Sequence, residues 1–441
     1  MIGSWTPEER DTVVYASAAL FALATIRLSS IELYRQWGEI ALGPYVLGAL
    51  FSLALVRRSR RTEGQEDRHN RFVGARVAIF LSVLAGATLL PLTLEIFLQS
   101  QTGGTTHAQP EVLVVEKSGQ RVAHGQDPYQ PVSKHTSTHS SAAPTGQPAY
   151  DQYDPYGPLM SLFGIPSSLH APPRLTDARI YFSLVTLLLV AIALALCRGA
   201  TEPRVLALQG MTVLPMTALP MATGGDDLPV AAVLLLGMFL LQRRRPLSGG
   251  LVLGFAAGLK FTAWPLVLLS FLVVRDGEGR RVRGILWQLA GMAVVLLPSV
   301  IPVFVHDPTS FINNVVRYPL GLASIGSPAA SALPGHILVS TFPQIKHVFP
   351  FVLAAAGAIV MGWILLRHRP RSVSDVCRLG GWLMTGAILL APATRVGYLL
   401  YPINFFIWSW LIRSEEDAEV SREAVSVVTL ADKKRVAPVP A

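Results

Sequence analysis

The feature that most constrains this chain is a series of apolar segments, each close to the roughly 20 residues that cross a hydrocarbon core as an α-helix. They lie at 11–28, 40–56, 72–98, 178–197, 203–222, 228–242, 285–305, 348–367, 379–394 and 397–412. Hydrophobic types make up 51% of the 441 residues and charged types 15%, which leaves too few polar side chains to cover a water-soluble globule. The sequence therefore predicts an all-α polytopic membrane protein, a bundle of about 10–12 transmembrane or re-entrant helices.

Arginine-rich runs in short loops predict which side of the membrane each loop faces. The runs are RRSRR at 57–61, QRRRP at 242–246, GRRVR at 279–283 and RHRPR at 367–371, a composition typical of cytoplasmic loops. Counting spans from the first run places both termini in the cytoplasm and the loops 99–157, 223–227 and 306–347 outside. Because these cations are dispersed among loops, we expect the lipid bilayer of the plasma membrane, and not a nucleic acid, as their partner.

Two apolar segments do not fit a simple count. The segment 249–273 lies between two basic loops that both indicate the cytoplasm, so the chain must turn back within it. Its sequence GLKFTAWP contains Lys260 and Pro265, which interrupt a helix, and a pair of half-helices is the expected result. The segment 158–170 is too short to span and is expected to be re-entrant or interfacial.

The polar loop 99–157 is the largest hydrophilic segment. Its stretches TGGTTHAQP and SKHTSTHSSAAPTGQP cannot build a core, and the four histidines His107, His124, His135 and His139 are expected to be solvated. Between these stretches, Val112, Val115 and Val122 recur at near-helical spacing, which predicts a short amphipathic helix on the outer leaflet. The resulting division is two extra N-terminal spans in 1–71, a membrane domain in 72–412, and a disordered cytoplasmic tail in 413–441.

Two acids of this loop are candidates for a general base. Glu111 and Glu116 lie just outside the third span, where a lipid-linked substrate would present its head group. A carboxylate there can take a proton from an attacking hydroxyl. The alternative is a solvated acid on a helix face, paired with Lys117 or Arg121.

Four further charged residues lie at the outer ends of spans. Asp226 and Asp227 follow two glycines and could bind sugar hydroxyls or a divalent cation such as Mg²⁺ or Mn²⁺, or an aspartate there could cap the next helix. Lys260 within the broken segment is expected to bind a phosphate, or to snorkel to the interface. Arg395, with Tyr398 and Tyr401 behind it, could grip a phosphate bidentately, although the tyrosines could be an aromatic belt.

Several of these motifs together resemble glycosyltransferase family 87. The run VAHGQDPYQP followed by YDQYDPYGPLMSLFGIP is similar to the paired signatures of that family's outer loop. The segment GLVLGFAAGLKFTAWPLVLLSFLVV and the run APATRVGYLLYP extend the resemblance, which covers roughly residues 72–412. It implies a GT-C fold and transfer of mannose or arabinose from polyprenyl-phosphate donors. It also implies a loop acid as base: Glu111 has the required spacing to Gly125, although the usual residue is Asp.

The resulting hypothesis is an inverting transfer of a hexose or pentose, with mannose favoured, to a cell-envelope glycan or glycolipid. Glu111, or its rival Glu116, acts as base, Lys260 and Arg395 bind the phosphate, and the outer segment 306–347 closes over the donor. The expected sugar-binding residues are Asp226, Asp227, Tyr129, Tyr153, Tyr156 and Tyr398. Two other classes stay open, a secondary transporter or lipid-linked-sugar flippase and a non-catalytic scaffold.

Overall fold

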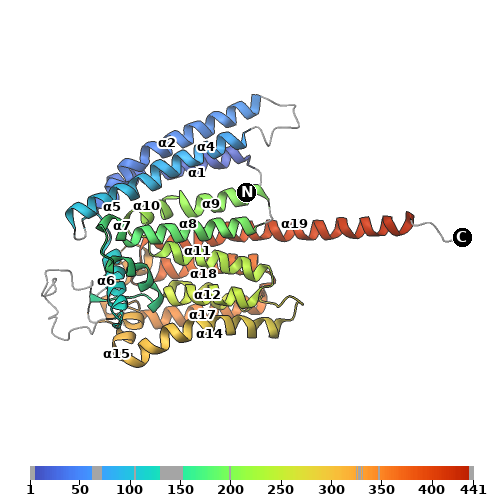
Figure 1. The fold of residues 1–441 in the computed structure, drawn as a ribbon. Helices are drawn as coiled ribbons and strands as arrows, with labels where there is room; N and C mark the ends of the chain where they lie inside the picture. The colour runs from blue at the N-terminus through green and yellow to red at the C-terminus, as the bar shows by residue number, and fades with distance from the viewer. Residues whose placement is uncertain are drawn as a thin grey trace.

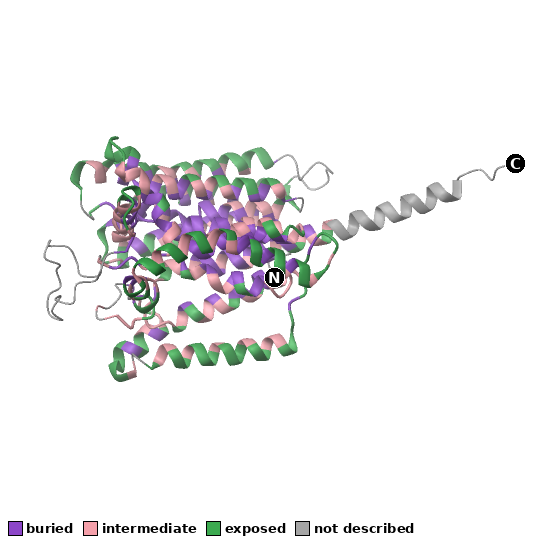
Figure 2. Ribbon diagram, turned by 60° about the horizontal axis from the view of Figure 1, so that its bottom comes forward, coloured by how far each residue is buried: buried purple, intermediate pink, exposed green. Residues whose placement is uncertain are grey.

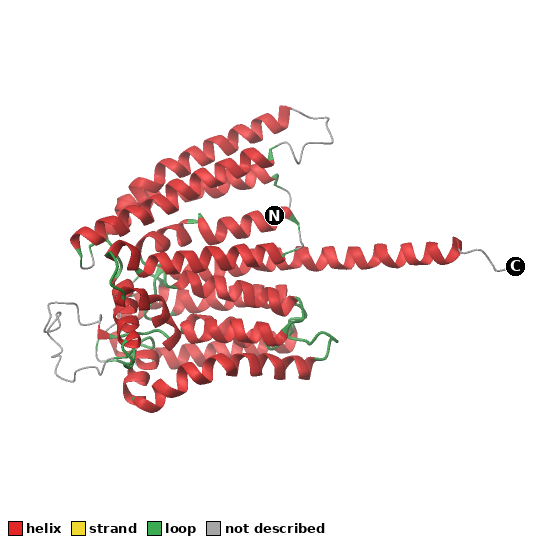
Figure 3. Cartoon of the chain, viewed as in Figure 1, coloured by secondary structure: helices red, strands yellow, loops and turns green. Residues whose placement is uncertain are grey.

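The computed structural model describes residues 5–61, 72–103, 106–129, 152–197, 200–323, 325, 329, 331–345 and 348–436, with side chains described as far as residue 418. These residues form a bundle of helices (Figures 1 and 3). Among them, eight helices are long and apolar enough to cross a membrane, and α11, α12 and the segment Phe261–Ser270 are apolar but shorter. The predicted all-α polytopic membrane fold is confirmed.

The first half of the bundle runs from α1 to α8. Its elements are α1 (Pro7–Leu28), α2 (Glu32–Arg61), α4 (Val73–Val83), the π-helical turn η2 (Leu84–Leu89), α5 (Leu90–Thr102), α6 (Pro110–Ala123), the 3₁₀ helix η4 (Pro158–Ser168), α7 (Pro173–Thr176) and α8 (Ala178–Leu196).

The second half runs from α9 to the C-terminus. It comprises α9 (Thr201–Thr212), α10 (Pro215–Thr223), α11 (Asp227–Gln242), α12 (Pro246–Leu259), η5 (Phe261–Ala263), α13 (Trp264–Ser270), α14 (Arg281–His306), α15 (Pro308–Phe311), η6 (Ile312–Arg317), α16 (Pro334–Thr341), η7 (Pro343–Ile345), α17 (Phe349–Arg367), α18 (Val373–Leu390), η8 (Val396–Leu399) and α19 (Leu400–Val436).

Three predicted segments differ from the structure. The span 203–222 is broken between α9 and α10, because Pro215 lacks the amide hydrogen that a continuous helix needs. The span 379–394 begins earlier and ends at Leu390, so Arg395 lies in the non-helical segment between α18 and η8. The tail 413–441 was expected to be disordered, but α19 continues as a helix to Val436.

The two ends of the bundle differ in composition. We call the end that carries the arginine runs 57–61, 242–246, 279–283 and 367–371 the basic end, and the opposite end, with α6 and η4, the loop end. At the basic end, ion pairs join Arg60 to Glu9 and Arg243 to Glu415, so the start of α1 and the middle of α19 lie there. At the loop end, α6 lies across the ends of the other helices (Figure 1).

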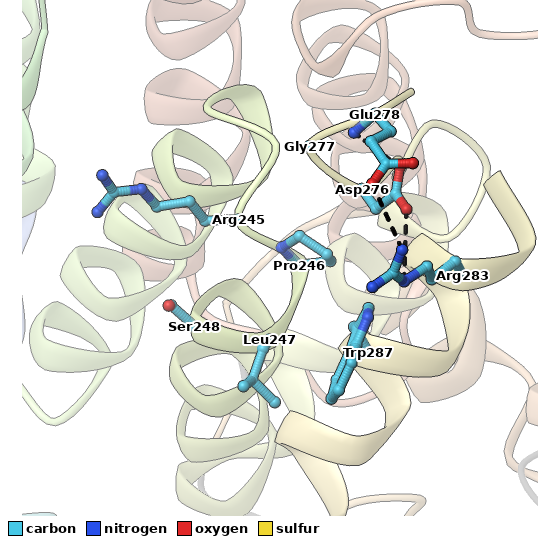
Figure 4. A pocket seen from close by; sticks show the side chains of 9 residues that line it. All are labelled: Arg245, Pro246, Leu247, Ser248, Asp276, Gly277, Glu278, Arg283 and Trp287. Atoms are coloured by element: carbon cyan, nitrogen blue, oxygen red, sulfur yellow. Dashed lines mark hydrogen bonds and ion pairs between the residues drawn. The ribbon is translucent and has the colours of Figure 1, made fainter. Parts of the chain in front are cut away.

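The segment 249–273 returns to the basic end, as predicted. α12 ends at Leu259, Lys260 has extended backbone, and a 3₁₀ turn leads into the short α13. Arg245 before α12 and Asp276 after α13 line the same pocket, together with Trp287 of α14 (Figure 4). Because the entry and the exit of the segment meet in this pocket, both lie at one end of the bundle.

The buried residues form two hydrophobic clusters. The larger includes residues of α6 and η4 and fills the bundle from α8 to α19, and the smaller joins α1 and α2 to α4, η2, α5 and α10. Purple buried residues accordingly gather in the interior, whereas the outward faces are green and pink (Figure 2). α17 has no buried residue along its length. Outward apolar faces of this kind are what a lipid-embedded bundle presents.

Candidate active site

Asp226, Asp227 and Lys260 form a buried ionic trio at the loop end. The Lys260 ammonium Nζ lies 2.8 Å from Asp226 Oδ2 and 2.8 Å from Asp227 Oδ1. The three side chains are only 8–11% exposed. Each of these charges would be costly to bury alone, and the pairing of the lysine with two carboxylates lowers that cost. Lys260 is therefore paired inside the bundle and does not snorkel to the interface.

Local chain breaks place the members of this trio. Lys260 is not helical, with φ −155° and ψ 146°, so its side chain leaves the line of α12 and reaches α11. Asp226 precedes α11 but its side chain makes no capping hydrogen bond. Both carboxylates are instead directed to the lysine, so the capping alternative for Asp226 is not what the structure shows.

Glu111 and Arg395 form a second ion pair, which joins the first turn of α6 to the segment before η8. Their side chains are 17% and 26% exposed, more than those of the trio. The second oxygen of Glu111, Oε2, is buried and has no hydrogen-bond partner. The pair is therefore the more accessible part of the site, and its carboxylate keeps one oxygen available.

Ala329 and Ser331 hold the chain around Arg395 in place. Thr394 donates its amide to Ala329 O at 2.9 Å, and Ser331 donates its amide to Thr394 O at 3.0 Å. Val396 then donates its amide to Ser331 Oγ at 3.1 Å. Part of the outer segment 306–347, which was predicted to close over the donor, thus lies directly against the chain around Arg395.

Two tyrosines connect the ion pair to the trio. The Lys260 ammonium lies 5.1 Å from the ring centre of Tyr156 and 5.6 Å from that of Tyr398, distances at which a cation is attracted to an aromatic face. Both tyrosines also lie within electrostatic range of the ion pair, Tyr156 of Glu111 and Tyr398 of Arg395. The predicted residues Glu111, Asp226, Asp227, Lys260, Arg395, Tyr156 and Tyr398 are thus gathered in one region.

A close backbone contact positions Tyr156. The following residue, Gly157, donates its amide to Leu259 O at 2.8 Å. A Cβ at Gly157 would lie 2.1 Å from Gly258 O, so only glycine permits this approach. The chain after Tyr156 is therefore held against the end of α12, next to Lys260.

Glu116 lies apart from this group. It is five residues from Glu111 on α6, about 140° further around the helix, and its carboxylate accepts a hydrogen bond from the Ala178 amide at 3.0 Å. It therefore satisfies the N-terminus of α8, together with the Asp177 side chain, which accepts from the Arg179 amide. Burial raises the pKa of Glu116 to about 7.

Tyr129 and Tyr153 form a layer behind the site. The Tyr129 hydroxyl donates to Tyr156 O at 2.7 Å, and its ring packs edge-on against Phe311. Tyr153 stacks on Tyr318 with ring centres 4.4 Å apart. Both tyrosines therefore support the segment that carries Tyr156.

Two further residues complete the site: Tyr401, which the sequence places beside Arg395 and Tyr398 without a role in sugar binding, and Asp154, which the sequence analysis did not include. Tyr401 donates its hydroxyl to Asp227 Oδ1 at 2.6 Å and lies 2.7 Å from Thr262 Oγ1. Asp154 is buried, its carboxylate accepts from the Tyr156 amide at 3.2 Å, and burial raises its pKa to about 7. Tyr401, one helical turn beyond Tyr398, was noted in the sequence with Arg395, whereas nothing in the sequence pattern singles out Asp154.

The Lys260 ammonium lies between the two aspartates, for which the sequence left open a divalent cation, sugar hydroxyls or a helix cap. Within the described part of the chain, no group of three or more His, Cys, Asp or Glu side chains forms a metal site. The positive charge next to these carboxylates thus comes from the protein itself.

Histidines of the loop that are described do not join the site. His107 lies 2.9 Å from buried Glu95 through Nδ1, and His124 lies 2.7 Å from Gln120 O. His107 is thus not solvated as predicted, but ties the start of the loop to α5. His135 and His139 lie outside the described residues.

Comparison with known families identifies the family of this chain. Residues 155–392 match the model of glycosyltransferase family 87, which is more than half of the 441 residues. The chain belongs to glycosyltransferase family 87. It is therefore a membrane glycosyltransferase, as the resemblance predicted. The match includes Tyr156 and the trio, but Glu111 precedes it and Arg395 follows it. None of the curated proteins compared with the chain matches it.

Proposed function

We propose that this family 87 protein moves a hexose or pentose, with mannose favoured, from a polyprenyl-phosphate donor to an envelope glycan or glycolipid. The observation that supports this proposal is the gathering of Glu111, Arg395 and the trio at the loop end. Carboxylates can take a proton from a sugar hydroxyl and accept hydrogen bonds from others, and a guanidinium suits a phosphate. Together they suit the two requirements of sugar transfer from a phosphate, activation of the acceptor hydroxyl and binding of the leaving phosphate.

Glu111 is the proposed base. Its Oε2 takes the proton of the acceptor hydroxyl, while the oxygen of that hydroxyl attacks the anomeric carbon of the donor sugar. The bond from the anomeric carbon to the phosphate oxygen breaks, and its electron pair leaves with the phosphate. A single displacement of this kind inverts the anomeric centre. The free and buried Oε2 supports this role, because no other hydrogen bond competes for it.

Arg395 is the proposed ligand of the departing phosphate, with Lys260 adding its charge from the buried side. Arg395 is already paired with Glu111, so a donor phosphate competes with that carboxylate for the guanidinium. Donor binding therefore weakens the hold of Arg395 on Glu111 and leaves the carboxylate of Glu111 free to meet the acceptor hydroxyl. This exchange links base activation to the presence of the donor.

Asp226 and Asp227 are the proposed sugar-binding carboxylates, with Tyr156 and Tyr398 as ring faces for the sugar. Lys260 holds both aspartates in a fixed position at 2.8 Å, which reduces the reorganisation that binding requires. Tyr129 and Tyr153 act through Tyr156 by fixing its segment.

We place the loop end outside the plasma membrane and the basic end, with both termini, in the cytoplasm. The arginine runs at the basic end support this orientation. Polyprenyl-phosphate sugars then reach the site from the outer leaflet, and the acceptor reaches it from the envelope.

The test uses purified protein in lipid nanodiscs with radiolabelled polyprenyl-phosphate mannose, polyprenyl-phosphate arabinose and a nucleotide sugar. Transfer of the lipid-linked mannose label is expected, with the product anomer opposite to that of the donor. Transfer from the nucleotide sugar alone contradicts the donor assignment. Movement of lipid-linked sugar across proteoliposomes without transfer favours the flippase alternative, and the absence of both favours the scaffold.

A further inference from the structure

The N-terminal helix pair α1 and α2, which precedes the matched residues 155–392, reaches the site through Tyr34. Tyr34 lies in the first turn of α2, and its hydroxyl accepts a hydrogen bond from Gln109 Nε2 at 2.6 Å. Both Glu111 and Arg395 lie within electrostatic range of this hydroxyl. The pair therefore contributes a polar group beside the proposed base.

Gln109 connects the two acid-bearing segments of the site. It is the residue before α6 and lies two positions before Glu111. Its backbone amide donates to Thr223 O at 2.7 Å, and its side-chain nitrogen Nε2 donates to Thr223 Oγ1 at 3.0 Å. Thr223 lies three positions before Asp226. The position of Gln109 thus sets the first turn of α6 relative to the chain that leads into Asp226.

Close packing leaves Gln109 little freedom on one side. A Cβ at Gly224 would lie 2.5 Å from Gln109 Oε1, so the amide oxygen lies directly against the glycine backbone. The Tyr34 hydroxyl meets the amide nitrogen. Removing that hydroxyl takes away one of the two side-chain partners of Nε2 and leaves the backbone bond intact.

Other contacts dock α2 without Tyr34. Trp37 donates its indole N–H to Ala87 O at 3.1 Å, and Tyr45 donates its hydroxyl to Val213 O at 2.6 Å. Both side chains are fully buried. The Tyr34 bond is therefore not required to hold the helix pair on the bundle, and its location at the site calls for another role.

We infer that Tyr34 is a positioning residue for sugar transfer: through Gln109 it holds the first turn of α6 so that Glu111 meets the acceptor hydroxyl. This inference rests on the proposed function. It assigns a part in the reaction to a helix pair outside the matched residues. Because Tyr34 acts on the placement of the base, its loss changes the rate of the chemical step more than the binding of either substrate.

The experiment compares Tyr34→Phe with Tyr45→Phe in the full chain in nanodiscs. Both variants remove one hydroxyl from a hydrogen bond of α2, but Tyr45 bonds to the break between α9 and α10. For Tyr34→Phe we expect kcat to fall about fivefold to tenfold, the effect of one neutral hydrogen bond, with both KM values changed less than about twofold. For Tyr45→Phe we expect a lower melting temperature and kcat within about twofold of wild type.

Hydrogen–deuterium exchange of residues 108–116 supplies a readout that does not depend on catalysis. Faster exchange of these amides in Tyr34→Phe, and not in Tyr45→Phe, is the expected result. Equal kcat in the two variants, or unchanged exchange in Tyr34→Phe, overturns the inference. Absence of transfer by the wild-type protein instead contradicts the proposed function, and the exchange result then decides whether Tyr34 holds α6.

Discussion

Two buried ionic clusters, one at each end of the bundle, have similar residues and different degrees of hydrogen-bond saturation. At the basic end, Arg76 lies 2.7 Å from Asp11 and donates two hydrogen bonds to Glu202. Gln209 Nε2 donates a hydrogen bond to the other carboxylate oxygen of Asp11 at 2.9 Å. Every carboxylate oxygen of this basic-end cluster therefore has a donor.

The cluster at the loop end is less complete. Glu111 Oε2 has no hydrogen-bond partner, and the Lys260 ammonium lies beside two tyrosine rings. The basic-end cluster joins α1, α4 and α9, so its saturated charges serve to hold helices together. The loop-end site keeps unused hydrogen-bonding capacity, which is what binding a polar substrate requires. Saturation of the carboxylate oxygens, rather than charge, distinguishes the two clusters.

The largest expected difference is in catalysis after removal of one charge from each cluster. Glu111→Gln should lower kcat for sugar transfer at least about 100-fold, in the range for loss of a general base, with an unchanged melting temperature. Glu202→Gln should lower the melting temperature and leave kcat per folded molecule unchanged. Steady-state transfer assays and thermal unfolding of both variants measure this. Retained transfer by Glu111→Gln contradicts the base assignment.

Removal of the central cation should destabilise either cluster. Lys260→Met leaves two buried carboxylates without a counter-ion, and Arg76→Met leaves Asp11 without one and Glu202 with Arg10 alone. For each we expect a loss of about 3–5 kcal/mol in unfolding free energy, measured as denaturant unfolding in detergent. Folded Lys260→Met should transfer no sugar, whereas folded Arg76→Met should stay active. A Lys260→Met protein as stable as wild type argues against the trio.

A smaller effect is expected from Tyr401→Phe, which removes the hydroxyl that donates to Asp227 Oδ1. Loss of one hydrogen bond to a carboxylate costs about 1.5–3 kcal/mol when the group stays buried. We expect kcat/KM for the donor to fall about tenfold. The matched control is Tyr15→Phe, whose hydroxyl accepts from Gln209 at the basic end and whose loss should leave kcat/KM unchanged.

A pH dependence of stability should arise at the loop end. Burial raises the pKa of Asp154 from 3.8 to about 7 in the folded protein. The folded state therefore keeps the Asp154 proton to higher pH than the unfolded state does. The contribution of protonated Asp154 to stability is complete below about pH 4 and is lost as pH rises through 7. The loss is at most about 1.4 kcal/mol per pH unit.

Thermal unfolding of wild type and Asp154→Asn between pH 4 and pH 8 measures this contribution. The melting temperature of Asp154→Asn relative to that of wild type should rise as the pH rises, because the asparagine side chain does not ionise. Glu116→Gln provides a second case, since burial raises the pKa of Glu116 to about 7 as well. Parallel curves for wild type and Asp154→Asn would falsify the assignment of the pH dependence to this carboxyl.

The smallest expected effect is that of a chelator. The Lys260 ammonium already lies 2.8 Å from both aspartates, so the trio carries its own positive charge. We expect EDTA to change kcat less than about twofold, within the scatter of such rates. A large loss that added Mg²⁺ or Mn²⁺ restores would show that a cation displaces the lysine.

Much of the fold follows from local sequence patterns. Apolar segments of spanning length, the breaks at Lys260 and Pro265, and the spaced valines of α6 all correspond to elements of the structure. These patterns can be recognised in the sequence because a bilayer requires each spanning segment to form its backbone hydrogen bonds within itself. Helix boundaries were less predictable, as the break before Pro215 and the long α19 show.

The sequence by itself determined the membrane architecture, the family resemblance and the residue types that gather at the loop end. Tertiary structure alone decided that Glu111 meets Arg395 while Glu116 meets Ala178, and that Lys260 meets two aspartates. It also brought Tyr34 to Gln109 across 75 positions of sequence. Spanning helices are specified locally by hydropathy, whereas a partner across the bundle depends on how helices distant in sequence pack, and a single chain carries no local signal for that.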